Sequence, residues 1–303
     1  MAGKAERTAN GGLAAAAEPG GGGSPFSAAG ARQMLLSAFS FSVMAVCVKQ
    51  LEGRIPVAEV VFARSVVSLG ISWWLIQRMG LNPWGKKRRM LVLRGIVGTL
   101  ALFCVYAALA ELPLAAATVF QYLYPTFTTA LAWGILGEIT GKRIFAAMAL
   151  GWLGVFMVAQ PFAASPLPAL PTAIAITGAL LTSIAYVTVR SLAEYENPMV
   201  IVFYFPLVSL PMSLPLLVLN PVLPSGNDWA WLIGVGIFTQ LGQIWLTQGL
   251  TQMPAARATA ISYAQVVFAA TWGVLFFGEI LNISTIIGAA LVLGATILSL
   301  KMK

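Results

Sequence analysis

Apolar stretches of about 20 residues, each long enough for a helix to cross a ~30 Å hydrocarbon core, recur along the chain with short polar segments between them. They cover residues 34–50, 57–77, 91–110, 114–136, 144–161, 172–190, 198–219, 229–250, 255–277 and 283–300. The pattern predicts an all-α membrane protein with ten transmembrane helices.

Composition agrees with this interpretation, since 59% of the 303 residues are hydrophobic and only 9% are charged. Residues 1–32 differ from the rest, being rich in Gly and Ala without a long apolar run. Such a segment buries too little apolar surface to offset its ordering entropy, so we expect a disordered cytoplasmic tail. A plastid or mitochondrial transit peptide is the alternative, which Glu6, Glu18 and the scarcity of Arg and Ser disfavour.

Several enzyme classes are excluded by residue usage. The chain has no histidine, which removes HExxH metalloproteases, Ser-His-Asp hydrolases and histidine proton relays. It also has no GxSxG, P-loop or CxxC motif, and its two cysteines, Cys47 and Cys104, fall inside apolar stretches where they suit packing. We therefore expect no enzyme, no cofactor and no metal site.

The net charge is +8, and the distribution of Lys and Arg along the chain indicates the orientation in the membrane. With ten spans, nearly all Lys and Arg residues fall in alternate loops, including PWGKKRRM at 83–90, and Arg54 is the main exception. The positive-inside rule then places both termini in the cytoplasm, and we expect a multi-pass protein of the bacterial inner membrane. The basic loop also suits anionic lipid, whereas nucleic acid is not an expected partner.

The chain repeats itself at an offset of 141 residues. Residues 109–139 match 250–280 at ten of 31 positions, including Pro113/Pro254 and a GEI tripeptide at the end of each copy. Residues 42–69 match 183–210 at nine of 28. Because each copy holds five spans, an odd number, the second copy enters the membrane inverted, as in many secondary transporters.

The segments ARSVVSLG (63–70) and LRGIVGTLALFCVYAALAELPLAAATV (93–119), with a proline-containing fourth span that closes on GEI, resemble the EamA-type drug/metabolite transporters. The resemblance covers residues 33–300. It implies one five-helix repeat over 33–162 and another over 172–301. It also implies a central cavity lined mainly by spans one, three, four, six, eight and nine, with spans five and ten at the periphery.

Polar side chains in these spans predict a substrate pathway. Unsatisfied amides and hydroxyls are unfavourable in lipid, so they should face protein or a wet cavity. Interhelical hydrogen bonding is the alternative. The candidates are Tyr106, Thr118, Gln121, Tyr122, Tyr124, Tyr186, Gln240, Gln243, Thr247, Tyr263 and Gln265.

Charges within or near spans are further candidates. Arg64 lies well inside the second span, Lys49 near the end of the first and Arg190 at the end of the sixth. Lys49 is close enough to the interface to snorkel, so its role is open. Arg94 begins the third span on the cytoplasmic side, where membrane anchoring and gating explain it equally well.

A proline, two glycines and two glutamates predict local features of the helices. Pro125 should kink the fourth span. Gly151 and Gly294 fit close helix contacts in spans five and ten, which support packing in the monomer first and a homodimer second. Glu138 and Glu279 precede those spans, where an acidic residue suits a helix N-terminus or a gate.

These observations predict a secondary transporter of small metabolites that works by alternating access, with a small-molecule substrate and the lipid bilayer as partners. Export of an amino acid or similar polar metabolite is the first expectation. Phosphorylated or nucleotide-linked metabolites come second, because they call for several basic groups at one site. A channel or a non-transporting receptor or scaffold is the alternative of another class.

Overall fold

The fold is given by a computed structural model of the chain. It describes residues 28–136, 146, 149–150, 152–154, 156–157, 167–219, 221–252, 258, 261–262, 264–278 and 283–300. Every regular element in these ranges is a helix. The predictions for Glu138, Gly151, Tyr263 and Glu279 lie outside the described residues.

Six of the described helices are long and apolar enough to cross a membrane. They are α1 (Ala28–Gln50), α2 (Val57–Arg78), α3 (Arg88–Glu111), α7 (Ala169–Leu192), α8 (Pro198–Leu219) and α9 (Asp228–Gln252). The shorter ones are α4 (Leu114–Gln121), α5 (Tyr124–Leu136), α11 (Ala264–Phe277) and α12 (Ile283–Leu300). The all-helical membrane class is confirmed, and the count of ten spans stays a prediction.

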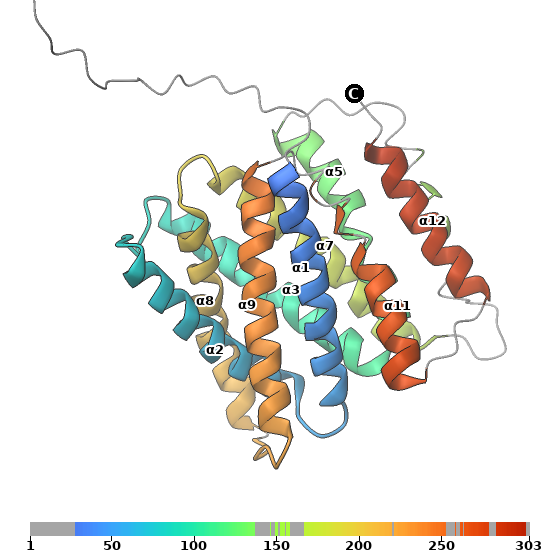
Figure 1. The fold of residues 1–303 in the computed structure, drawn as a ribbon, viewed down its shortest axis with the longest axis horizontal. Coiled ribbons are helices and arrows are strands. Elements are labelled where there is room, and N and C mark those ends of the chain that lie inside the picture. The colour runs from blue at the N-terminus through green and yellow to red at the C-terminus, as the bar shows by residue number, and fades with distance from the viewer. Residues whose placement is uncertain are drawn as a thin grey trace, which may run out of the picture.

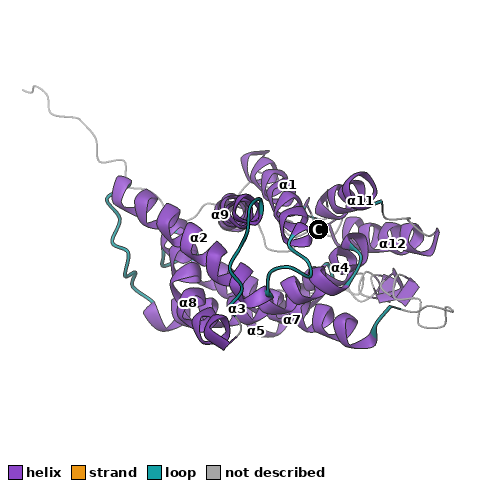
Figure 2. Cartoon of the chain, turned by 90° about the horizontal axis from the view of Figure 1, so that it is seen from below, coloured by secondary structure: helices purple, strands orange, loops and turns teal. Residues whose placement is uncertain are grey.

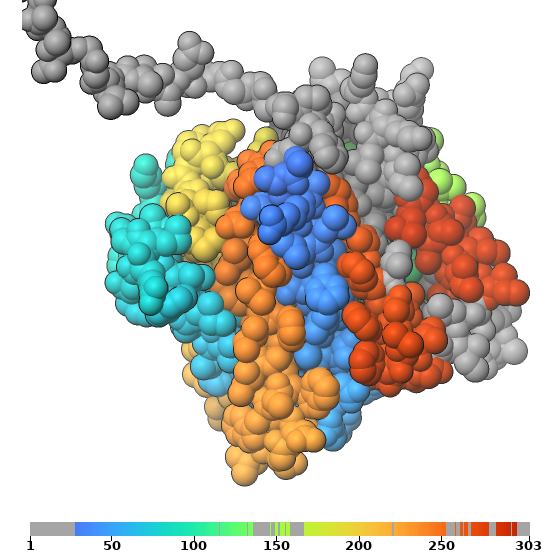
Figure 3. All heavy atoms as spheres, viewed as in Figure 1, coloured from blue at the N-terminus to red at the C-terminus, as the bar shows by residue number. Residues whose placement is uncertain are grey.

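The helices form one bundle around a central region (Figures 1 and 2). Helix α1 packs against α9 and α11, while α3 packs against α7 and α8. Helix α2 contacts both α8 and α9, and α4 lies between α7 and α11. Figure 3 shows α1 flanked by α9 and α11 on one face, and α12 lies at the edge of the bundle. Large apolar side chains such as Leu35 and Ile233 remain exposed, as lipid contact requires.

The fourth span is not the single kinked helix that the sequence predicted. It is interrupted by a turn at Tyr122 and Leu123, which separates α4 from α5. Pro125 has no N–H to donate to the carbonyl of Gln121, so the helical ladder ends there. The same proline then sits in the first turn of α5, where the missing N–H is not needed. A turn also falls at Ser262, just before α11.

Positions 141 residues apart make equivalent contacts between helices. A Cβ atom added to Gly95 on α3 would lie 2.7 Å from side-chain carbons of Val208 on α8. A Cβ added to Gly236 on α9 would lie 2.5 Å from Val67 on α2. The two glycines are repeat mates, and so are the two valines. The α2–α9 and α3–α8 seams are therefore built by the same close approach.

Loops that the sequence places on one side of the membrane meet in the structure. The carboxylate of Glu196, after α7, accepts the backbone N–H groups of Lys86 and Lys87, both at 2.5 Å, in the loop before α3. At the opposite end Arg54 pairs with Asp228 at 2.7 Å. These contacts agree with the predicted alternation of sides.

Gly294 lies on α12, near the expected fifth span. A Cβ at this position would lie 3.8 Å from Leu150 Cδ2, which is an ordinary van der Waals distance. Much of the fifth span lies outside the described residues, so a close helix contact at Gly294 stays a prediction.

Candidate substrate-binding cavity

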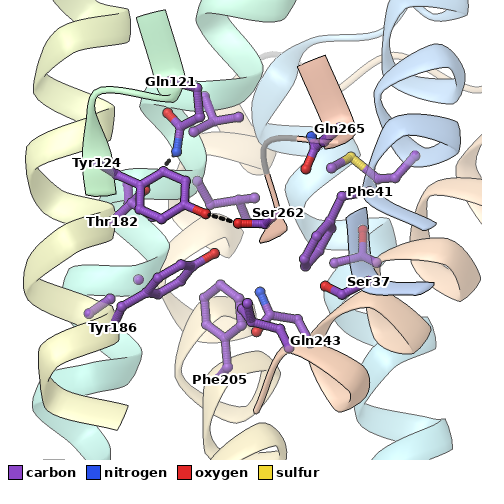
Figure 4. Close-up of a pocket in the computed structure, with 18 of the residues that line it drawn as sticks. Ser37, Phe41, Gln121, Tyr124, Thr182, Tyr186, Phe205, Gln243, Ser262 and Gln265 are labelled. Atoms are coloured by element: carbon purple, nitrogen blue, oxygen red, sulfur yellow. Dashed lines mark hydrogen bonds between the residues drawn. The ribbon is translucent and has the colours of Figure 1, made fainter. Parts of the chain in front are cut away.

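A cavity of about 110 Å³ lies at the centre of the bundle, where the broken fourth span meets α3, α7 and α9 (Figure 4). This volume holds several water molecules. Helices from both halves of the chain supply its walls. The lining consists of Ser37, Phe41, Met44, Arg64, Arg94, Gly98, Ala101, Leu102, Val105, Tyr106, Gln121, Tyr122, Tyr124, Thr182, Ala185, Tyr186, Phe205, Thr239, Gln243, Leu246, Ser262 and Gln265.

Two buried arginines dominate the electrostatics of this cavity. Arg64 on α2 and Arg94 on α3 are each 1% exposed. Their guanidinium carbons lie 4.6 Å and 4.2 Å from the centroid of the Phe205 ring. The negative face of an aromatic ring attracts such cations, and the attraction is stronger when water is excluded. Both positive charges are thus held by one phenylalanine of α8.

The arginines have few polar partners. Arg94 Nη2 donates to Gln243 Oε1 at 3.2 Å. Within the described residues, Nε and Nη1 of both Arg64 and Arg94 are buried without a hydrogen-bond acceptor, and neither guanidinium pairs with a carboxylate. The cavity wall therefore carries uncompensated positive charge.

Hydroxyl and amide groups close the other side of the cavity, at the breaks before α5 and α11. Tyr122 donates to the Ser262 carbonyl at 2.5 Å and to Gln265 Oε1 at 2.8 Å. The hydroxyls of Tyr124 and Ser262 lie 2.5 Å apart. Gln121 Nε2 donates to Thr182 Oγ1 at 2.9 Å, and Figure 4 shows this bond beside the Tyr124–Ser262 contact. The turns thus present polar groups that a continuous helix would place differently.

Many of the predicted pathway residues meet in this cavity. They come from α2, α3, α4, α5, α7, α9 and α11 and from the turn between α4 and α5. This group consists of Arg64, Tyr106, Gln121, Tyr122, Tyr124, Tyr186, Gln243 and Gln265.

The structure places other candidates elsewhere. Lys49 donates to the Leu112 carbonyl at 3.0 Å and pairs with Glu52 at 2.8 Å, near the end of α1. Gln240 Nε2 donates to Ser72 Oγ at 2.7 Å and so links α9 to α2. This contact is the interhelical bonding that the sequence left as the alternative.

The last three candidates also lie outside the wall of the main cavity. Thr118 bonds to the Leu114 carbonyl at 2.7 Å and lines a smaller adjoining cavity of about 30 Å³. Thr247 is buried on α9 without lining either cavity. Arg190 is half-buried near the end of α7 and does not line them either.

Sequence reasoning missed several residues of the wall: Arg94 as a cavity residue, and Ser37, Phe41, Phe205 and Thr239 altogether. Arg94 had one local signal, a glycine four residues later on the same helical face. A Cβ on Gly98 would lie 2.9 Å from Arg94 Nη1, so the guanidinium occupies the space that this glycine leaves. Phe205 had no signal of its own, because one more phenylalanine in an apolar span looks like packing.

A helical bundle whose membrane-crossing core encloses a cavity with two arginines and several hydroxyl and amide groups is typical of membrane transport proteins. Residues 28–160 and residues 171–301 each match the EamA-like transporter family. The chain belongs to this family, which is one of membrane transporters. The resemblance in sequence is thereby confirmed.

Several similar proteins are named as transporters. The pseudopaline exporter CntI of Pseudomonas aeruginosa is 30% identical over 270 residues, covering 89% of this chain and 95% of that protein. Human solute carrier family 35 member G1 is 28% identical, covering 87% of this chain and 76% of its own length. A solved crystal structure with 18% identity superposes with a TM-score of 0.66, covering 89% and 94% of the two chains, which supports the fold.

Proposed function

We propose that this protein is a secondary transporter that carries a small polar metabolite through the central cavity by alternating access. The observation that carries the proposal is a central cavity that is lined from both halves of the chain and carries two arginines and several hydroxyl and amide groups in a largely apolar wall. Its walls come from helices of each family match, so movement of one half against the other would change access to it. The equivalent Gly95–Val208 and Gly236–Val67 contacts support two similar halves.

The proposed arrangement is two five-helix repeats, over residues 33–162 and 172–301, inserted with opposite orientations. In this arrangement the protein lies in the inner membrane of a bacterium and both of its termini are cytoplasmic. Export is the favoured direction, and a relative 30% identical to this chain is named as an exporter. A homodimer remains a secondary proposal, without a role in forming the cavity.

The substrate proposed first is an amino acid or a similar small metabolite. The cavity of about 110 Å³ suits a molecule of a few heavy atoms better than a nucleotide-linked compound. A phosphorylated small metabolite is the second candidate, because Arg64 and Arg94 bring two basic groups to one wall.

Counterflow in proteoliposomes tests the function. Purified protein is reconstituted, loaded with a high concentration of one unlabelled metabolite and diluted into a trace of its labelled form. A carrier gives transient, saturable accumulation of label, because the internal substrate drives exchange. A channel gives linear equilibration without saturation, and a receptor or scaffold gives none, so either result would refute the proposal.

A further inference from the structure

We infer that Arg64, Arg94 and Phe205 form a binding site for a small dianion, either a dicarboxylate or a phosphate monoester. The inference rests on the proposed transport function and narrows the substrate class of the same cavity, because it selects metabolites with two negative charges over amino acids that carry no net charge. Both guanidiniums line that cavity, are 1% exposed and lie against one ring.

The charge balance of the cavity favours an anionic ligand. A charged side chain at membrane depth is unfavourable unless it is paired or hydrated. The cavity lining contains no acidic side chain among the described residues. Glu59, the acidic residue nearest Arg64 in sequence, instead accepts the backbone N–H of Val222 at 3.2 Å. A ligand bearing two negative charges would neutralise what the protein leaves uncompensated.

The two arginines also supply hydrogen-bond donors that suit an anion. A guanidinium presents N–H donors in a planar fork that matches a carboxylate or a phosphate. Arg94 uses Nη2 on Gln243, while Nε and Nη1 of Arg94 and of Arg64 have no acceptor in the described structure. Arg64 and Arg94 both line the cavity, so a side-chain adjustment that turns these unpartnered N–H groups toward a ligand would give them an acceptor.

Phe205 lies against both arginines. Both guanidinium carbons lie within 4.6 Å of the Phe205 centroid, so the two arginines share one aromatic neighbour in the wall of the same cavity. Phe205 is the repeat mate of Arg64, and Val235 is the repeat mate of Arg94. The first half therefore supplies the charges and the second half supplies the aromatic surface that orients them.

The experiment measures thermal unfolding of the full chain in lipid nanodiscs with four probes. Succinate and glycerol 3-phosphate are the dianions, and succinamide and glycerol are their uncharged counterparts. A ligand that binds the folded state raises its unfolding midpoint. We expect at least one dianion to do so and neither neutral probe to do so. The dianion that binds distinguishes a carboxylate substrate from a phosphate ester.

The variants are Arg64→Gln and Arg94→Gln, each expected to weaken binding of the active dianion by about ten- to a hundredfold, as loss of a charge-assisted contact does. Arg64→Lys and Arg94→Lys keep the charge without the fork, so they should bind with intermediate affinity and cover the case of a glutamine variant that fails to fold. Arg78→Gln is the matched control, because Arg78 stacks on the exposed Trp74 at 4.7 Å on the same helix, outside the cavity.

The site would be refuted if neither dianion raised the unfolding midpoint, or if the uncharged counterparts raised it equally. It would also be refuted if the glutamine and lysine variants of Arg64 and Arg94 all bound the dianion as tightly as the unmodified protein. Counterflow of the bound probe in the same preparations separates the two proposals. Arginine-dependent binding without counterflow refutes transport and leaves the site intact. Saturable counterflow of a neutral solute that Arg64→Gln does not alter refutes the site and leaves transport intact.

Discussion

The seam between α2 and α9 gives a sharp test of the packing described above. In Gly236→Ala the new Cβ would lie 2.5 Å from Val67 Cβ, 2.7 Å from Cγ1 and 3.0 Å from Cγ2. Non-bonded carbons pack at about 3.5–4.0 Å. Val67 cannot rotate away, because a β-branched side chain on a helix has essentially one favourable rotamer. The two helices must therefore separate.

The expected magnitude follows from two opposing terms. Overpacking of this kind costs about 1–3 kcal/mol. Alanine is favoured over glycine in a helix by about 1 kcal/mol, which offsets part of that loss. We expect Gly236→Ala to lower the free energy of unfolding by about 1–2 kcal/mol. Gly95→Ala should do the same, since its Cβ would lie 2.7 Å from Val208.

The assay is unfolding of the purified protein in mixed micelles by added SDS, followed by tryptophan fluorescence. Gly70→Ala on α2 is the control, because nothing lies within 4 Å of a Cβ there, and it should be neutral or slightly stabilising. Adding Val67→Gly to Gly236→Ala removes the Val67 Cβ that makes the closest contact, so the two changes together should cost less than the sum of their separate costs, as coupling between touching residues requires. Equal behaviour of Gly236→Ala and Gly70→Ala, or a double variant no better than the sum of its parts, would refute this packing.

Three further predictions follow from other contacts. Cysteines placed singly at Lys87 and Asn227 in a cysteine-free background should label from opposite membrane sides, with residue 87 cytoplasmic; labelling from one side contradicts the inverted arrangement. Gln243→Ala should raise the apparent substrate constant in counterflow about tenfold, while Gln240→Ala should mainly lower the unfolding midpoint, and reversed effects contradict their placement. Glu196→Ala should increase protease cleavage of the loop before α3, because two backbone N–H groups lose their acceptor; unchanged cleavage contradicts that role.

The fold class could be predicted from sequence, because apolar runs of membrane-spanning length indicate that the helices are surrounded by lipid. The repeat at 141 residues pairs Gly95 with Gly236 and Val67 with Val208, and the structure brings a glycine of one pair against a valine of the other in both seams. The break between α4 and α5 could be predicted only in part from the sequence. Pro125 predicts lost hydrogen bonding, but a kinked helix and two separate helices share that local signal, and the surrounding contacts decide between them.

The site was less accessible, since periodicity assigns a residue to a helix face without naming the neighbour of that face. Gln240 and Gln243 stand three residues apart on one stripe, yet one reaches Ser72 on α2 and the other reaches Arg94 in the cavity. For Arg94 the sequence suggested a position at the membrane interface, and the structure places it in the cavity wall. Near a helix start it looks like an interfacial anchor, whereas its long side chain extends from the helix to the cavity beside Gly98.

The location of both arginines in the first half of the chain has an electrical consequence. If the halves move against each other during transport, the two charges travel with α2 and α3 relative to α8 and α9. Without a bound anion, that movement displaces fixed charge through a region of low dielectric constant, and the cost per elementary charge is the crossed fraction of about 2.3 kcal/mol per 100 mV, the value for a complete crossing. With a dianion bound, the moving unit is close to neutral. We therefore expect the loaded carrier to reorient more readily than the unloaded one, which favours one-for-one exchange across the membrane over net flux and makes the net mode the voltage-sensitive one.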